Sequence, residues 1–328
     1  MNLLEQQASN RRRTVLVMGL FVAFFLLLGF GFDLFVAGWH AGYAPVGGLV
    51  ALGLGCLSAV TGYFNGDRAV LASANARPIA QLAAGPIDDE RRLKLRQLQN
   101  VVDEMAIAAG LPRPRVYLVP DEDPNAFATG RDPHHASIAV TQGLLDRLSR
   151  DELQGVVAHE MSHIRNYDIR LMTVVAALVG AVVLLADWSA RAMRFGGLRG
   201  GRRGRSRNGG GGAVVLIVLV VWLVAVTVAP IAAQLLAMSV SRQREYLADA
   251  SGAELTRNPG ALADALERIE SCIEPTRAIK RGSAHLCIAD PLGRRLGLKE
   301  GFWPDLLATH PPMATRIAAL RKMSYARG

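Results

Sequence analysis

The stretch VVAHEMSHIRNYDIRLMTVVAALVGAVVLL, residues 156–185, decides how the rest of the chain is interpreted. It begins with two histidines, His159 and His163, on either side of Glu160, and it continues into an uncharged apolar run. Residues four apart share one face of an α-helix, so both imidazoles can reach one metal ion. The apolar run is typical of a membrane segment. The stretch therefore predicts a metal site at the edge of a bilayer.

Four apolar segments are candidates for membrane spans, because roughly 18 or more apolar residues are needed to cross a bilayer. They lie at about 14–37, 44–65, 171–187 and 213–240. The third is the shortest, which favours a short span or one partly covered by protein.

Three arginines, Arg11, Arg12 and Arg13, precede the first apolar segment, as in a secretion signal. The segment is longer than a signal core, and a second hydrophobic segment follows closely, so we expect a membrane anchor. The arginines then place the N-terminus in the cytoplasm.

Residues 191–212 contain seven arginines and no acid, and they contribute much of the net charge of +9. Their glycine and arginine composition favours a disordered linker, with contact to anionic lipid headgroups as the alternative. Nothing in this segment resembles a base-reading module, so no nucleic-acid partner is expected. If the third and fourth segments both span, the linker lies outside the cell, against the positive-inside tendency; a shallow hairpin is the other possibility.

The chain has three cysteines, Cys56, Cys272 and Cys287, and no C-x-x-C pattern. An odd number without that spacing argues against a disulfide scaffold and against a thiolate zinc site, and reduced thiols are expected.

The polar segments outside the apolar runs are expected to be mainly helical with a small β-sheet. An amphipathic helix is predicted at 87–111 and short strands at 115–120 and 135–141. Ser149 followed by Glu152 is a capping-box pattern that predicts the start of the helix carrying both histidines.

The H-E-x-x-H pattern needs a third ligand, because a catalytic zinc site uses three protein ligands and water. Glu245 and Asp249 are four residues apart and share a helix face. Glu245 can complete a two-histidine, one-glutamate site, and Asp249 can accept the second N–H of a ligand histidine. Glu160 can accept a proton from the water. The alternative for Glu245 and Asp249 is a solvated charged face.

The motifs HEMSHIRNYD, SRQREYLADASGA and THPP resemble the membrane zinc metalloproteases of the HtpX family, relatives of the CAAX prenyl endopeptidases. The resemblance covers most of the chain in the same motif order. It implies that His159, His163 and Glu245 bind one zinc ion, that Glu160 is the catalytic base, and that Asp249 matches the aspartate after the third ligand.

The resemblance also implies a gluzincin-like metalloprotease domain combined with about four transmembrane helices. From the placement of the apolar segments, residues 1–66 are expected to form an N-terminal membrane hairpin and 67–170 the first part of the metalloprotease domain. Residues 171–240 are expected to form a second membrane hairpin that contains the 191–212 linker, and 241–328 to complete the domain.

His163 lies seven residues before Arg170, and Glu245 lies five residues after Val240, the end of the fourth apolar segment. Because both ligand-bearing helices thus emerge from membrane segments, the zinc ion is expected near the cytoplasmic face of the membrane.

Residues 125–145 are similar to the family segment that forms an edge strand before the zinc helix. The resemblance implies that Asn125, Ala126 and Phe127 contact substrate, with affinity from backbone pairing. The alternative for Asn125 is an ordinary turn residue.

His310 precedes two prolines, and Arg316 follows six residues later. Pattern alone favours a helix N-terminus, with His310 or Thr309 as its cap and Arg316 as a surface charge. The resemblance implies instead that His310 stabilises negative charge on the scissile carbonyl, and that Arg316 orients His310 or binds the substrate backbone.

The function predicted from these observations is a zinc endopeptidase of the bacterial cytoplasmic membrane, with its active site facing the cytoplasm. Its expected partners are polypeptides, chiefly misfolded or damaged membrane proteins, and the lipid bilayer. Alternatives are a narrow-specificity processing protease, a non-proteolytic membrane scaffold with a vestigial metal site, and a transporter or channel. Glu160 argues against the scaffold. Asp33 is the main charge within the spans, and so few charges argue against a transporter.

Overall fold

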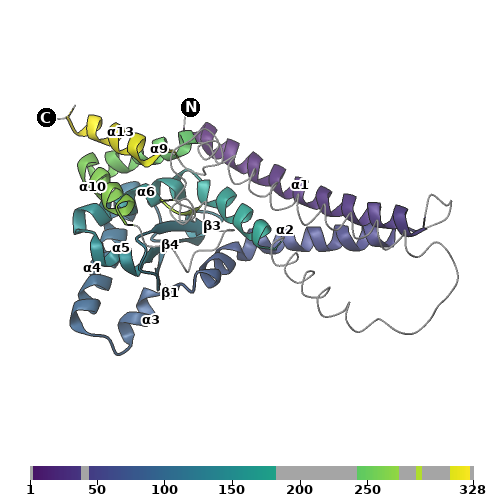
Figure 1. Ribbon diagram of the computed structural model, residues 1–328, viewed down its shortest axis with the longest axis horizontal. Coiled ribbons are helices and arrows are strands. Elements are labelled where there is room, and N and C mark those ends of the chain that lie inside the picture. Colours follow the sequence, from purple (N-terminus) through teal and green to yellow (C-terminus); the bar gives the residue numbers. More distant parts are fainter. Residues whose placement is uncertain (1–2, 38–43, 182–241, 273–285, 290–310, 326–328) are drawn as a thin grey trace.

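The computed structural model describes residues 3–37, 44–181, 242–272, 286–289 and 311–325. A globular body of helices surrounds a small sheet, and a long pair of helices projects from it (Figure 1). The predicted fold class, mainly α with a small β-sheet, is confirmed.

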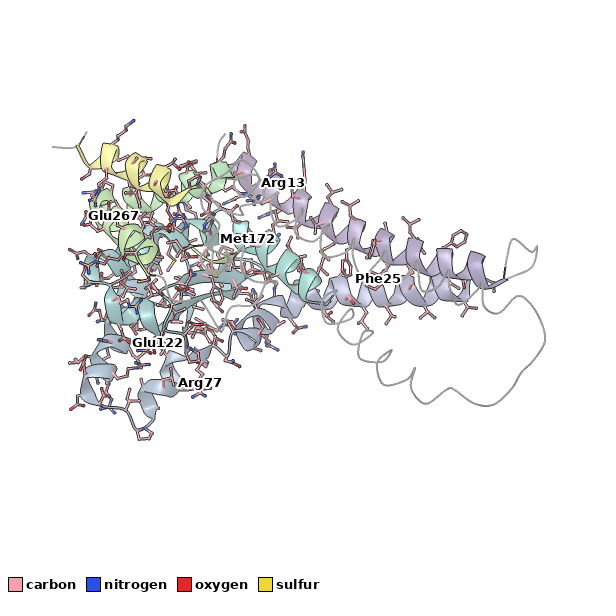
Figure 2. All side chains as sticks on the ribbon, viewed as in Figure 1. Arg13, Phe25, Arg77, Glu122, Met172 and Glu267 are labelled. Atoms are coloured by element: carbon pink, nitrogen blue, oxygen red, sulfur yellow. The ribbon has the colours of Figure 1, made fainter. Side chains whose placement is uncertain are left out.

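The projecting pair consists of α1 (Leu3–Ala37) and α2 (Val46–Ser73). Most of the large apolar side chains that are exposed in the described residues lie on these two helices. Figure 2 shows Phe25 along the pair and Arg13 at the end where α1 meets the body. Within the described residues, Glu5–Gly31 and Val46–Ser73 are the two stretches long and apolar enough to cross a bilayer. They correspond to the first two predicted spans.

Asp33 lies on α1 and is buried against the start of α2. Its two carboxyl oxygens accept hydrogen bonds from the backbone N–H groups of Gly47 and Gly48, at 2.8 and 2.6 Å. The first N–H groups of a helix have no partner within that helix, and in lipid they must find one inside the protein. A role in joining the two helices therefore accounts for the acidic residue in an apolar segment.

The third apolar segment is largely covered by protein in its described part. Residues 168–181 are helical, and most side chains from 171 to 178 are buried. This helix packs on α2, where a Cβ added to Gly66 would lie 3.0 Å from Thr173 Cγ2. The fourth segment, 213–240, and the 191–212 linker lie outside the described residues. The number of spans and the domain boundaries therefore stay predictions.

The body contains a four-stranded sheet in the order β1-β2-β4-β3. Strand β4 pairs parallel with β2 and antiparallel with β3, so β3 is an edge strand. The short helix η1 joins β3 to β4. The bounds are Arg77–Pro78 (β1), Arg115–Val119 (β2), Ala126–Gly130 (β3), Pro133–His135 (η1) and Ala136–Thr141 (β4).

Seven further helices with complete bounds make up the rest of the body in the described residues (Figure 1). Two of these helices, α4 and α6, were predicted from local patterns. Helix α4 ends at Gly110, which has a φ of 65°, and the predicted capping box of α6 is present at Ser149 and Glu152. The helices are α3 (Ile79–Ala84), α4 (Asp89–Ala109), α5 (Gln142–Arg147), α6 (Arg150–Arg165), α9 (Arg242–Thr256), α10 (Pro259–Glu270) and α13 (Met313–Tyr325).

Candidate metal centre

Helix α6 carries the two histidines of the H-E-x-x-H pattern into the interior of the body. The side chains of His159 and His163 are 0% and 5% exposed. Their Nε2 atoms lie 3.2 Å apart and face the same point, as the four-residue spacing predicts.

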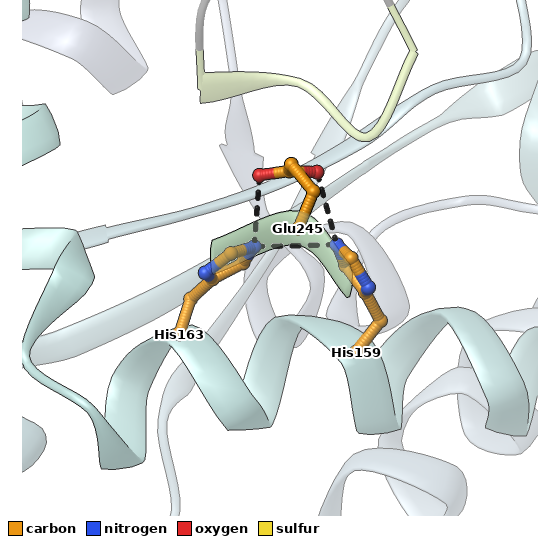
Figure 3. A group of neighbouring side chains, drawn as sticks. All are labelled: His159, His163 and Glu245. Carbon is orange, nitrogen blue, oxygen red and sulfur yellow. Dashed lines mark hydrogen bonds and ion pairs between the residues drawn. The ribbon is translucent and has the colours of Figure 1, made fainter. Parts of the chain in front are cut away.

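Glu245 reaches the same point from the first turn of α9 (Figure 3). Its carboxylate oxygens lie 3.8 Å from His159 Nε2 and 3.6 Å from His163 Nε2. Helix α9 can come this close to α6 because Gly252 has no side chain. A Cβ added to Gly252 would lie 3.1 Å from the backbone nitrogen of His159. A glycine on one helix thus permits the approach that brings the third side chain to the histidines.

The three side chains fit a tetrahedral metal ion. Two ligand atoms about 2.0–2.1 Å from a tetrahedral zinc ion lie about 3.3 Å from each other. One donor atom from each of the three residues lies within 4.8 Å of the others, and all three residues are buried. Two imidazole nitrogens and a carboxylate oxygen are a donor set typical of catalytic zinc, with one position left for water.

His159 is held from behind by a buried carboxylate. Its Nδ1 lies 2.9 Å from Asp249 Oδ1, so its Nε2 is directed toward the other ligands. Arg316 on α13 holds Asp249 in turn, through Nε at 2.8 Å and Nη2 at 2.7 Å. Burial acts to raise the pKa of Asp249, but the Arg316 guanidinium lowers it to about 2. The carboxylate therefore stays charged and oriented.

His163 has an equivalent arrangement that the sequence patterns did not predict. Its Nδ1 lies 3.1 Å from Asp168 Oδ2. Asp168 Oδ1 accepts a hydrogen bond of 2.6 Å from the side chain of Asn10 and lies 3.6 Å from Arg244 Nη1. Asp168 is five residues after His163, a spacing that does not share a helix face. It reaches the imidazole because α6 ends and Tyr167 adopts a φ of 60°.

Glu160 lies beside the three candidate ligands and is 1% exposed. Burial raises its pKa to about 7, and the nearby Glu245 carboxylate also acts to raise it. A carboxyl group with a pKa near neutrality can both accept and return a proton at physiological pH.

The edge of β3 is occupied by another part of the same chain. Residues 286–289 pair antiparallel with it, with Phe127 opposite Cys287. The Ala126 carbonyl accepts a 3.0 Å hydrogen bond from the Ile288 N–H, and the Asn125 amide donates to the Ala289 carbonyl at 3.0 Å. The three residues predicted to contact substrate thus lie on an edge that accepts an extended chain.

His310 and Arg316 are the two remaining predicted site residues. His310 lies outside the described residues. Arg316 is 0% exposed, so it is not the surface charge that pattern alone favours. Besides Asp249, it donates to the Ile288 carbonyl at 2.9 Å, and it lies 3.6 Å from Glu245.

We predict that Gly252→Ala weakens metal binding. The added methyl group contacts the α6 backbone at His159, and α9 must move away by a few tenths of an ångström, which separates Glu245 from the histidines. Gly260→Ala on α10 is the control, because a Cβ there meets its nearest neighbour at 3.5 Å. Competition with a chromophoric chelator measures both affinities. Equal zinc affinity for the two variants would contradict this account of the close approach.

Comparisons with known proteins agree with this site. The model of peptidase family M48 matches residues 92–324. A protein described as a protease HtpX homolog from Thermoanaerobacter pseudethanolicus is 41% identical over 98% of this chain and 98% of its own length. Another from Lactiplantibacillus plantarum is 42% identical over 98% of this chain and 100% of its own.

Among solved structures, the crystal structure of S. mikatae Ste24p matches with a TM-score of 0.48 and 16% identity, over 97% of this chain and 67% of that one. The family model includes α6, α9 and all three candidate ligands, and the HtpX relatives match nearly from end to end. The resemblance noted from the motifs is therefore confirmed, and the chain belongs to peptidase family M48 as a metalloprotease of the HtpX type.

Proposed function

We propose that this metalloprotease is a zinc endopeptidase that cleaves misfolded or damaged membrane proteins on the cytoplasmic side of the bacterial cytoplasmic membrane. The observation that carries the proposal is the convergence of His159, His163 and Glu245 beside Glu160, in a body attached to two apolar helices. The expected relation to stress and quality control rests on the HtpX resemblance.

The proposed metal ligands are His159, His163 and Glu245, and zinc suits this donor set. Bound zinc supplies a Lewis acid that polarises the scissile carbonyl and lowers the pKa of water. Asp249 and Asp168 keep the two imidazoles directed at the centre.

Glu160 is the proposed general base. It accepts a proton from the attacking water and returns it to the leaving amine, a role suited to a buried carboxyl group with a pKa raised to about 7. His310 is the proposed donor to the carbonyl oxygen as negative charge develops there. Arg316 is proposed to act by fixing Asp249, with its contact to the Ile288 carbonyl linking it to the substrate edge.

A substrate is proposed to bind as an extended strand on the outer edge of β3. The segment 286–289 supports this, since it pairs with that edge through backbone groups. Backbone pairing accepts many sequences, which suits damaged proteins of varied sequence. We propose that the substrate takes the place of residues 286–289 and that Asn125, Ala126 and Phe127 then pair with it.

Substitution of the proposed base and of the third ligand should separate chemistry from metal binding. Glu160→Gln should abolish proteolysis and retain zinc, because the base is not a ligand. Glu245→Ala should lose zinc and activity together. Casein digestion with and without a chelator, combined with metal analysis of each purified protein, tests both. If Glu160→Gln cleaves casein at the wild-type rate, Glu160 is not the general base. If Glu245→Ala keeps tightly bound, stoichiometric zinc, Glu245 is not the third ligand.

A disulfide between β3 and residues 286–289 should block substrate. Phe127 and Cys287 are cross-strand partners, and such partners have Cα separations that a disulfide can bridge. In the Phe127→Cys variant, oxidation should form a disulfide between the new cysteine and Cys287. The oxidised protein should be inactive on casein and should regain activity on reduction. Phe127→Ser controls for the lost aromatic ring and should not respond to reductant. Full activity of a quantitatively cross-linked protein contradicts displacement of the segment.

The proposed orientation is tested by labelling cysteines in intact cells with a membrane-impermeant reagent. Cys272 lies in the body, while Ala44 lies at the far end of the helix pair beside the start of α2. With the other cysteines replaced, Cys272 should label only after lysis, and Ala44→Cys should label from outside. Labelling of Cys272 in intact cells contradicts a cytoplasmic active site.

A further inference from the structure

The first turns of α1 carry a polar face that is buried in the protein rather than exposed to lipid. Gln6, Asn10 and Thr14 are 4%, 2% and 2% exposed, and their spacing of four residues places them on one side of the helix. This face meets the end of α6, where the Gln7 side chain donates to the Arg165 carbonyl at 2.8 Å. The N-terminal membrane helix is thus docked beside the candidate metal centre.

Asn10 contacts this region through both ends of its carboxamide. Its Nδ2 donates to the Asn166 carbonyl at 3.0 Å and to Asp168 Oδ1 at 2.6 Å. Its Oδ1 accepts from Arg244 Nη1 at 3.5 Å. Acceptors surround the nitrogen and a donor meets the oxygen, which fixes the orientation of the amide.

The contact with Asp168 extends to a proposed metal ligand. Asp168 Oδ1 accepts from Asn10, while Oδ2 lies 3.1 Å from His163 Nδ1. Asp168 is buried, so its orientation depends on protein donors and not on solvent. Partners behind a ligand histidine fix its ring and its tautomer, and their removal typically weakens metal binding by about 10- to 100-fold.

We propose that Asn10 is a positioning residue of the metal centre. By holding the Asp168 carboxylate, it fixes the His163 imidazole, so that the site is complete only when α1 is docked on the body. His159 receives its equivalent support from α9 and α13, entirely within the globular body. The inference rests on the proposed role of His163 as a ligand.

Zinc affinity of the full-length protein in detergent tests this proposal, measured by competition with a chromophoric chelator. Asn10→Ala should weaken zinc binding by about 10-fold or more, because Asp168 loses a donor. Gln7→Ala is the matched control. This substitution removes one hydrogen bond between α1 and the end of α6, and Gln7 does not hydrogen-bond to Asp168. The zinc affinity of this variant should therefore stay at the wild-type value.

A double-mutant cycle identifies the route of the effect. In an Asp168→Asn background, which weakens binding by itself, adding Asn10→Ala should cause little further loss, because both changes break the same link. An equal further loss in that background would show that Asn10 acts independently of Asp168 and would overturn the proposal.

The thermal midpoint with and without saturating zinc separates positioning from simple docking. Positioning predicts that Asn10→Ala reduces the zinc-induced rise in the midpoint, since that rise depends on zinc affinity. If Asn10→Ala lowers both midpoints equally and keeps wild-type zinc affinity, or if Gln7→Ala weakens zinc binding as much, Asn10 is only a docking residue. Should Asn10→Ala not fold, Asn10→Leu, which keeps a similar side-chain volume but has no donor, is judged by the same criteria.

Discussion

The structure depends on bringing a carboxylate from α9 to two imidazoles on α6 in the buried interior of the body. Charged groups buried there cost several kcal/mol each unless other groups pair with them. The protein meets this requirement with alternating charges. Asp249 lies between His159 and Arg316, and Asp168 lies between His163 and Arg244. The extended buried network, and not the three candidate ligands alone, therefore makes the centre stable.

The turn after α6 explains why the metal-ligand pattern leads directly into an apolar segment. The chain turns at Tyr167 after α6, and the following helix packs on α2 at the base of the projecting pair. The same turn places Asp168 against His163 and within reach of Asn10 on α1. The junction between the membrane helices and the body is thus also one wall of the metal centre.

Features encoded by local spacing could be predicted from the sequence. The capping box at Ser149, the helix end at Gly110 and the shared face of His159 and His163 depend on residues a few positions apart. The pairing of Glu245 with Asp249 on one face was also predicted, and both reach the histidines.

Contacts between distant segments could not be predicted in this way. Asn10 is separated from Asp168 by 158 positions, and residues 286–289 pair with a strand far from them in sequence. Asp168 was missed for a different reason, because its five-residue spacing from His163 points away from the histidine face unless the helix breaks. The positive φ at Tyr167 supplies that break, and nothing in the local pattern indicated it.

Zinc K-edge X-ray absorption of the purified, zinc-loaded full-length protein tests the central claim most directly. Two histidines, a glutamate and water predict only nitrogen and oxygen donors, at about 2.0–2.2 Å, with the multiple-scattering signature of two imidazoles. A sulfur shell at about 2.3 Å, or a spectrum that requires fewer than two imidazoles, would contradict it.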